Sequence, residues 1–247
     1  MKSEVPRLYA ARSGTAGPRV VLLHGAGGCH HVWHYFVRRL GRSARVWALD
    51  LPGHCKSEPP PEHTFDEFLR ILRLWFDEAL GGAPEVVVGH SMGGLLALGL
   101  AAQEARIQRL VVLSAALRIP VQPRRRVDPQ EVEDICRRIY HQERWIRWCV
   151  KHRSQVILST PPIMLRDLEM VRQVDLRPLA PRIRQPVHLA VGRYDQAVTE
   201  PLVRETLNLL PSARLTWLEH SGHMPHLEEA ARVAELIEEE LQHVQGA

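Results

Sequence analysis

Short apolar runs alternate along this chain with longer stretches in which apolar residues recur at helical spacing. Six runs are brief, aliphatic and bounded by turn residues, as buried strands are: 20–23, 46–49, 85–88, 110–113, 187–191 and 214–218. Strands separated by helices are typical of βαβ units. The pattern therefore predicts an α/β protein with a mostly parallel sheet that helices cover on both faces.

Four helices are predicted between and after these strands. Residues 64–80 form an amphipathic pattern in which Thr64 and Glu67 have the spacing of a capping box, and Gly81-Gly82 ends it. Residues 92–104 are rich in glycine and alanine, which predicts a helix buried closely against the sheet. Residues 199–210 and 226–244 complete the set.

Residues 118–183 break the alternation, because they contain helix-like stretches and seven prolines but no convincing strand. We interpret this segment as a helical cap inserted into the core. At 247 residues, the chain suits one domain of this kind. The predicted organisation is a core formed by 1–117 and 184–247, with the cap at 118–183.

The sequence Gly89-His90-Ser91-Met92-Gly93 follows one predicted strand and opens the small-residue helix. It fits a nucleophile elbow, in which a serine sits on a tight, strained turn and the flanking glycines leave room for it. The alternative is a structural serine in a packing turn. We expect Ser91 to be a catalytic nucleophile.

A serine hydroxyl needs a base to take its proton. His223 lies in a loop after the last predicted strand, at the sheet edge where ligands bind in α/β proteins. His220 and His226 are close competitors, and a loop histidine can simply be solvated. We expect His223 to be the general base.

A third residue should orient the imidazole and stabilise its charged form. Asp195 comes just after the strand at 187–191, and the chain order Ser, Asp, His is the order found in α/β hydrolases. A turn cap is the alternative role for Asp195. The segment after 110–113 begins Ser114-Ala115-Ala116 and offers no carboxylate.

Acyl transfer also needs backbone donors for the developing oxyanion, each worth about 2.7–4 kcal/mol. Met92 directly follows the nucleophile and should supply one amide. The other should come from the glycine-rich loop His24-Gly25-Ala26-Gly27-Gly28, where we choose the amide of Ala26.

The blocks LHGAGG, DLPGHCKS, GHSMGG, GRYD and SGH, in this order, resemble the α/β-hydrolase superfamily over nearly the whole chain outside the cap. This resemblance implies the α/β-hydrolase fold and a carboxylesterase-like enzyme. One departure is Cys55, where similar proteins usually have glycine. We interpret it as a tolerated small residue, with a modifiable thiol near the site as the alternative.

The resemblance also narrows the possible activities. Haloalkane dehalogenases carry an aspartate at the nucleophile position, so Ser91 argues against that class. Menaquinone-pathway synthases usually have arginine soon after the serine, whereas this chain has Gly93, Gly94 and Leu95, so that class is also disfavoured. Small esterases, enol-lactonases, carbon–carbon bond hydrolases and pimeloyl-acyl-carrier-protein methyl ester esterases remain compatible. We expect hydrolysis of a small or medium carboxylic ester through an acyl-enzyme. The alternatives are carbon–carbon cleavage or elimination on a ring acid with the same triad, and a non-catalytic binder.

The cap should decide which substrate reaches the nucleophile. Trp145 and Trp148 lie three apart on an expected helix, near Ile139 and Ile146, and are our candidates for lining an acyl pocket. Ordinary packing of cap against core is the alternative.

Charge is distributed unevenly along the chain. The net charge is +4, but residues 118–184 hold fourteen Arg and one Lys against eight acidic residues, a net +7, which leaves −3 elsewhere. An acidic acyl carrier protein is one candidate partner for the basic cap, and a solvated arginine-rich surface is the other interpretation. No nucleic-acid-binding motif accompanies the charge.

Other classes of site are not indicated. His24, His30, His31 and His34 lack the acidic or cysteine spacing of a metal site, so we expect neither metal nor cofactor. The four cysteines, Cys29, Cys55, Cys136 and Cys149, are irregularly spaced and are expected to be free thiols. The N-terminus lacks a signal-like apolar region and no run is long enough to span a membrane, so a cytoplasmic location is expected.

Overall fold

A computed structural model describes residues 6–122, 132–151 and 161–245. Its centre is a seven-stranded sheet of order β1-β3-β2-β4-β5-β6-β7, in which only β1 runs antiparallel to its neighbour. The strands are β1 (Ala10–Ser13), β2 (Arg19–Leu23), β3 (Arg45–Leu49), β4 (Val86–His90), β5 (Arg109–Leu113), β6 (Val187–Gly192) and β7 (Ala213–Leu218).

The six predicted strands are confirmed to within two residues at each end. The pattern missed β1, because this edge strand is short and none of its side chains is fully buried. It pairs with β3 in antiparallel register, Ala10 opposite Leu49. A half-exposed edge strand lacks the continuous apolar run that marks a central parallel strand.

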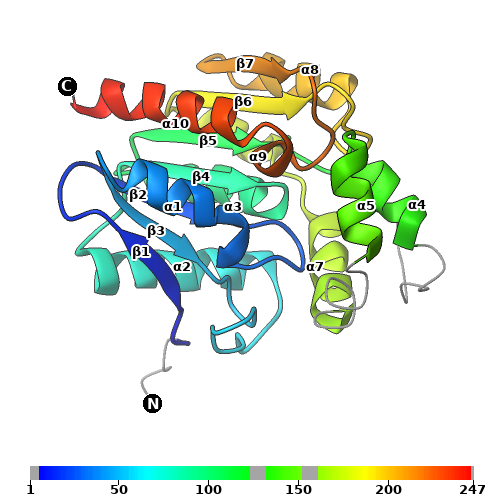
Figure 1. Cartoon of the computed structure of the whole chain (residues 1–247). Helices are drawn as coiled ribbons and strands as arrows, with labels where there is room; N and C mark the ends of the chain where they lie inside the picture. The colour runs from blue at the N-terminus through cyan, green and yellow to red at the C-terminus, as the bar shows by residue number, and fades with distance from the viewer. Residues whose placement is uncertain (1–5, 123–131, 152–160, 246–247) are drawn as a thin grey trace.

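Helices cover both faces of the sheet, as Figure 1 shows. On one face of the sheet, η1, α1 and α10 pack against side chains such as Leu22 and Val88. On the other face, α2, α3 and α8 pack against side chains such as Leu23 and Val87. Successive strand residues point to opposite faces, so both layers are apolar. The helices of the core are η1 (His30–Trp33), α1 (His34–Leu40), α2 (Phe65–Leu80), α3 (Met92–Ala101), α8 (Glu200–Leu209), α9 (Pro225–Glu228) and α10 (Ala230–Gln245).

Local signals set the ends of α2 largely as expected. The Thr64 side chain accepts a hydrogen bond from the Glu67 amide at 3.3 Å, and Gly81 ends the helix in the left-handed conformation. The Glu67 carboxylate pairs with Arg70, one turn along the same helix, at 2.7 Å. The first half of the capping box is therefore present.

One predicted helix needed revision, and two helices were not predicted. The helix expected at 226–244 is two helices, because the chain leaves helical geometry at Glu229 between α9 and α10. The pattern also missed η1 and α1, which follow the glycine-rich loop directly.

The chain between β5 and β6 contributes helices and, within the described residues of 118–183, no strand. These helices are α4 (Val132–Ile139), α5 (Glu143–Lys151), α7 (Pro161–Gln173) and η3 (Arg177–Arg182). They lie beside the carboxyl ends of the strands (Figure 1). Two of the seven prolines of this segment, Pro123 and Pro129, and four of its arginines, Arg124–Arg126 and Arg153, lie outside the described residues.

The prediction of four free thiols was wrong for one pair. Cys136 on α4 and Cys149 on α5 form a disulfide, with Cα atoms 6.5 Å apart. Helices α4 and α5 pack against each other and bring together cysteines 13 positions apart, a proximity that their spacing in the sequence does not encode. Cys29 and Cys55 are free. In the part of the chain that the structure describes, no helix is long and apolar enough to cross a membrane.

Candidate active site

Ser91 occupies a sharp turn between β4 and α3. Its backbone has φ 52° and ψ −115°, a conformation that costs a non-glycine residue free energy. A side chain at Gly89 would meet the Gly93 carbonyl at 2.1 Å, and one at Gly93 would meet the Leu23 carbonyl at 2.3 Å. Glycine is therefore required on both sides of the turn that presents the Ser91 hydroxyl.

Three loops bring Ser91, His223 and Asp195 together. His223 Nε2 lies 3.0 Å from Ser91 Oγ, and His223 Nδ1 lies 2.9 Å from Asp195 Oδ2. Because a carboxylate only accepts hydrogen bonds, Nδ1 carries the proton of the neutral ring, and Nε2 is left as the acceptor for the serine hydroxyl. The arrangement can move a proton from Ser91 to His223.

Asp195 is held as a carboxylate in a buried position. Burial opposes its ionisation, but the charge and hydrogen bond of His223 and the amides of Ala197 and Val198, at 2.8 and 2.9 Å, lower its pKa below the ordinary value. Asp195 therefore also caps the turn that follows it, which is the alternative role considered for this residue. Its Oδ1 accepts the hydrogen bonds from both amides.

Burial also acts on His223, where it favours the neutral ring. The charge of Asp195 and its hydrogen bond outweigh burial and raise the pKa of His223 above 6.5. The backbone of His223 is anchored from the next loop, because His90 Nε2 donates to its carbonyl at 2.7 Å. Burial has the largest effect on His90 and lowers its pKa well below 6.5, so the ring stays neutral. The charges of the neighbouring His226 and His223 act in the same direction.

Neither competing histidine is hydrogen-bonded to Ser91 in the described part of the chain, although His226 lines the same cavity. His220 is exposed, and its amide donates to Glu229. His226 is buried beside the Trp33 ring, and its imidazole nitrogens contact no acceptor or donor among the described residues. Burial lowers the pKa of His226 to about 3, so it stays neutral.

The proposed oxyanion donors flank Ser91. Met92 is the first residue of α3, where helix geometry leaves the N–H without an acceptor inside the helix. Ala26 lies in the glycine-rich loop and lines the cavity above Ser91. His24 fixes this loop: its Nδ1 donates to Gly25 O at 2.8 Å and its Nε2 accepts from Leu51 N at 3.0 Å.

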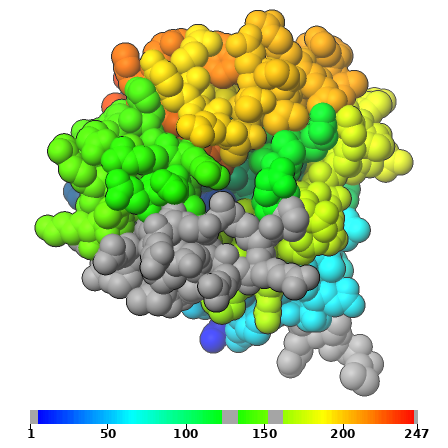
Figure 2. Space-filling model, turned by 90° about the vertical axis from the view of Figure 1, so that its right-hand side faces the viewer, coloured from blue at the N-terminus to red at the C-terminus, as the bar shows by residue number. Residues whose placement is uncertain are grey.

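A cavity of about 490 Å³ opens over the Ser91 hydroxyl and the His223 ring. Its apolar wall is formed by Val32, Ile119, Val121, Ile139, Leu168, Val171 and Met224. Arg138, Gln122 and Gln196 add polar groups. Figure 2 views the molecule from the side of the inserted helices, and α4 and α5 (green) border a hollow there.

The structure separates the two predicted acyl-pocket residues from this cavity. Neither Trp145 nor Trp148 is among the described residues that line it, whereas Ile139 is. Trp145 stacks with Tyr140 at 6.1 Å inside the cluster around the disulfide, and Trp148 is 45% exposed. Trp145 thus packs between α4 and α5, within the inserted segment, whereas the alternative considered above was packing of the cap against the core.

Sequence reasoning missed a second buried carboxylate, Asp167 on α7. It accepts from the Gly27 amide at 2.7 Å, and its oxygens lie 2.8 Å from Nε2 of both His54 and His63. Burial opposes ionisation, but these hydrogen bonds and the nearby His54 charge lower the pKa of Asp167. Asp167 therefore joins α7 to the glycine-rich loop 24–28, a long-range contact for which the sequence carries no local signal.

A third carboxylate, Glu228 on α9, joins the loop of His223 to the start of α5. It accepts at 2.7 Å from each of three amides, those of His141, Gln142 and Gly222. The His223 amide itself donates to Ile139 O at 2.7 Å. The inserted helices thus contact both the glycine-rich loop and the loop of His223, which lie on either side of Ser91.

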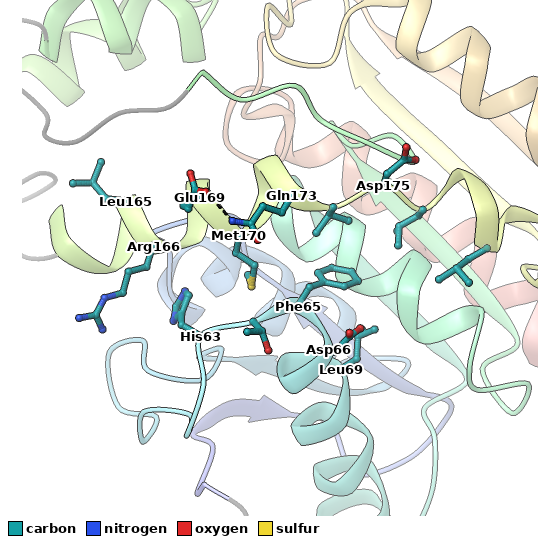
Figure 3. A pocket seen from close by; sticks show the side chains of 14 residues that line it. His63, Phe65, Asp66, Leu69, Leu165, Arg166, Glu169, Met170, Gln173 and Asp175 are labelled. Carbon is teal, nitrogen blue, oxygen red and sulfur yellow. Dashed lines mark hydrogen bonds between the residues drawn. The ribbon is translucent and has the colours of Figure 1, made fainter.

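A further cavity of about 620 Å³ lies between the start of α2 and α7 (Figure 3). His63, Phe65, Arg166 and Met170 are among the side chains around it. It contains no member of the Ser91, Asp195 and His223 set, so the chemistry described above belongs to the smaller, more apolar cavity.

Comparison with known proteins agrees with this geometry. The model of the alpha/beta hydrolase family matches residues 20–236. A pimeloyl-[acyl-carrier protein] methyl ester esterase from Methylococcus capsulatus is 30% identical, over 94% of this chain and 97% of that protein. The Vibrio vulnificus protein of the same name is 28% identical, over 86% and 90%.

Among solved structures, the enol-lactonase from Burkholderia xenovorans LB400 superimposes with a TM-score of 0.81. It is 24% identical and the match covers 96% of this chain and 97% of that one, which shows a shared fold. The match of the family model over most of the chain, the sheet order and the relatives at 28–30% identity lead to one conclusion: this chain belongs to the alpha/beta hydrolase family, as an esterase-like enzyme.

Proposed function

We propose that this protein is a serine esterase that cleaves a small or medium carboxylic ester through an acyl-enzyme. The observation that carries the proposal is the continuous hydrogen-bonded series from Asp195 through His223 to Ser91 Oγ, at 2.9 and 3.0 Å, at the floor of an apolar cavity. A nucleophile, its base and an orienting carboxylate within bonding reach are the components of nucleophilic acyl transfer.

In the first half of the reaction, Ser91 Oγ attacks the ester carbonyl carbon while its proton passes to His223 Nε2. The carbonyl oxygen becomes an oxyanion that the amides of Ala26 and Met92 stabilise. Collapse of this intermediate breaks the bond to the alkoxy group, which leaves as the alcohol with the proton from His223.

In the second half, water attacks the acyl group on Ser91, and His223 takes its proton. The second oxyanion collapses, the serine oxygen leaves with the proton from His223, and the carboxylic acid is released. Asp195 stays ionised throughout and stabilises the charged ring.

The substrate class follows from the cavity. A space of about 490 Å³ with an aliphatic wall fits an acyl chain, and Arg138 and Gln122 supply polar contacts for a distal group. In this proposal, residues 118–183 act as the cap of a core formed by 1–117 and 184–247. The named relatives act on a methyl ester of a carrier-bound chain, which is the sharpest form of the proposal.

An acidic carrier protein would meet the exposed basic side chains of α4 and α5. Arg138, Arg144, Arg147 and Lys151 are exposed, whereas Arg137 is paired with Glu133 and Glu143. These exposed cations, of which Arg138 lines the cavity, would steer an acidic partner toward it. High salt should then weaken activity on a carrier-bound ester more than on a free ester.

The test is hydrolysis of p-nitrophenyl esters of graded acyl length, with labelling by a fluorophosphonate probe. We expect labelling and turnover in the native protein, with both lost in Ser91→Ala and kept in Ser114→Ala, a buried serine outside the cavity. Folded native protein that takes no label would favour a non-catalytic binder. Labelling without turnover of any ester, combined with cleavage of a ring acid, would favour carbon–carbon chemistry.

A further inference from the structure

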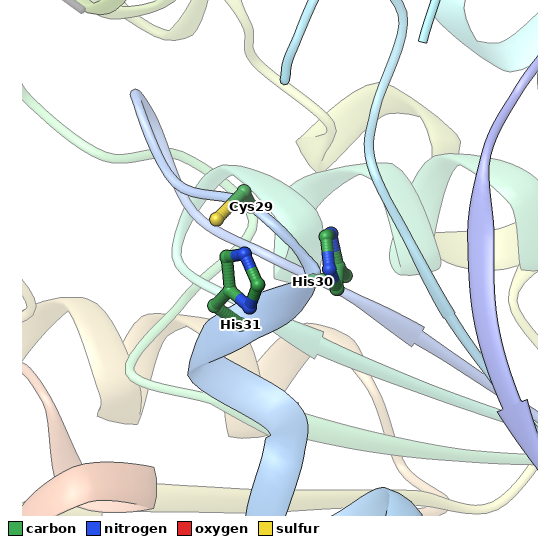
Figure 4. Close-up of side chains that lie close together, drawn as sticks. All are labelled: Cys29, His30 and His31. Atoms are coloured by element: carbon green, nitrogen blue, oxygen red, sulfur yellow. The ribbon is translucent and has the colours of Figure 1, made fainter. Parts of the chain in front are cut away.

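Two loops next to the glycine-rich loop 24–28 bring thiols and imidazoles together. Cys29, His30 and His31 have potential ligand atoms within 4.8 Å of one another, and Cys29, Asp50 and Cys55 form a second such group that shares the Cys29 sulfur. Figure 4 shows Cys29 beside the two imidazoles at the start of η1. Cys55 comes from a different segment, the loop after β3.

We propose that Cys29, Cys55, His30 and His31 form a binding site for a borderline-soft divalent cation such as Zn²⁺. Two sulfurs and two imidazole nitrogens are a ligand set that tetrahedral zinc prefers. With ligand bonds of about 2.0–2.3 Å, the ligand atoms of such a site lie roughly 3.3–3.8 Å apart. The two groups share the Cys29 sulfur, and the side chains of His31 and Cys55 are exposed, so each can rotate toward a metal ion bound to Cys29.

Asp50 has the position of a residue that orients a metal ligand. It is fully buried, and its Oδ1 accepts from both the amide and Nδ1 of His30 at 2.8 Å. Because Nδ1 donates to the carboxylate, the lone pair of His30 is on Nε2, which is the nitrogen left to bind a metal. A carboxylate on the far side of a ligating histidine is the usual arrangement in metal sites.

The backbone at Cys55 supports the same conclusion. Cys55 has φ +43°, a left-handed conformation that favours glycine, yet a thiol stands there and lies close to Cys29. A side chain kept in a strained conformation next to other ligands points to a function for that side chain.

The charges of the site also balance. With both thiols ionised, Cys29, Cys55 and Asp50 carry one negative charge each. The dication and Lys56, whose ammonium lies over the Tyr9 ring beside His30, offset them. The thiol protons are released on binding.

The test measures metal binding directly, on the full chain under reducing conditions. Zinc affinity would be determined by competition with a chromophoric chelator, and Co²⁺ would be added as a spectroscopic probe. We expect one Zn²⁺ per chain, and a Co²⁺ spectrum with the sulfur-to-metal charge-transfer band and the intense visible bands of a tetrahedral thiolate site.

Variants identify the ligands. Cys29→Ser should raise the Kd for Zn²⁺ by at least about 100-fold and abolish the charge-transfer band, and His31→Ala by about tenfold. Cys55→Gly removes the second thiol while relieving the backbone, so a loss of affinity there cannot come from misfolding. The double variant Cys136→Ser/Cys149→Ser should keep full binding.

Native protein that binds no Zn²⁺ or Co²⁺ at micromolar metal, or binding that survives Cys29→Ser, would overturn the proposal. Binding lost only in the Cys136→Ser/Cys149→Ser variant would do so as well. Ester hydrolysis plays no part in these readouts, so the outcome is independent of the proposed catalytic role of Ser91.

Discussion

Asp195 and Asp167 are buried aspartates that each contact a histidine, in two regions with different surroundings. Asp195 holds a single ring, His223, whose second nitrogen faces the Ser91 hydroxyl in the cavity. Asp167 contacts His54, whose second nitrogen faces the Pro52 carbonyl. The aspartate–histidine contact is the same in both. What the far nitrogen faces decides whether the pair can act on a substrate or only joins segments of the chain.

Asp195→Asn is the substitution with the largest expected effect. The amide cannot hold the His223 tautomer that accepts from Ser91, so kcat should fall by about 10⁴, with only a small change in Tm. Steady-state kinetics with a p-nitrophenyl ester and a thermal melt measure both. A loss of less than tenfold, with the fold intact, would contradict the role given to Asp195.

Asp167→Asn should give the opposite pattern. Removing one partner of a buried, hydrogen-bonded charge costs about 3–5 kcal/mol, or roughly 6–20 °C in Tm for a chain of this size. The effect on kcat should stay within about 100-fold, because Asp167 acts only through Gly27. Differential scanning calorimetry and kinetics at 20 °C would separate the two effects.

The matched control is Asp175→Asn, an exposed aspartate paired with Arg177, which should shift the free energy of unfolding by less than about 0.5–1 kcal/mol.

The pH dependence of stability provides a second check on Asp167. The pKa of Asp167 is lowered in the fold, so its stabilisation is full above its unfolded pKa, about 3.9, and is lost as pH falls through the lower folded value. The Tm difference between native protein and Asp167→Asn should therefore shrink below about pH 4.

The pH–activity profile should report the His223 ring. Only the neutral ring accepts the Ser91 proton, and its pKa is raised by Asp195, so kcat/KM should fall about tenfold per pH unit below a midpoint above 6.5. In Asp195→Asn the charge is gone and burial remains, so the midpoint of the residual activity should move to lower pH. An unchanged midpoint would show that another group controls the profile.

A helix-cap substitution calibrates the larger effects. Thr64→Ala removes the side chain that caps α2 and should cost about 0.5–2 kcal/mol of stability. Thr64 lies outside the Ser91 cavity, so kcat should not change. Urea denaturation and kinetics would show whether a loss of stability alone leaves turnover intact.

The comparison also explains what the sequence could predict. Central strands and the elbow at Ser91 were readable because an apolar run, a strained turn and its glycines are all local features. His223 and Asp195 could be placed in loops because parallel strands end at one edge of the sheet.

The missed features depend on contacts between distant segments. Asp167 reaches Gly27 across 140 positions, and Glu228 reaches Gln142 across 86. Trp145 and Trp148 were assigned to the cavity from helical spacing, but spacing identifies an apolar face and not the surface that the face packs against. The disulfide between Cys136 and Cys149 was missed for the same reason.

The contacts of Glu228 and Asp167 limit how this protein can be engineered. Ile139 and Gln142 bind the loop of His223, and α7 binds the loop of Ala26 through Gly27. Grafting residues 118–183 from a relative to change substrate preference would remove those bonds unless Glu228, His54 and His63 find matching partners in the graft. A chimera that keeps the hydrogen bonds of Glu228 and Asp167 should keep its turnover. A chimera in which only the ends of the graft are joined would have a new pocket, but its His223 ring would be displaced from Ser91.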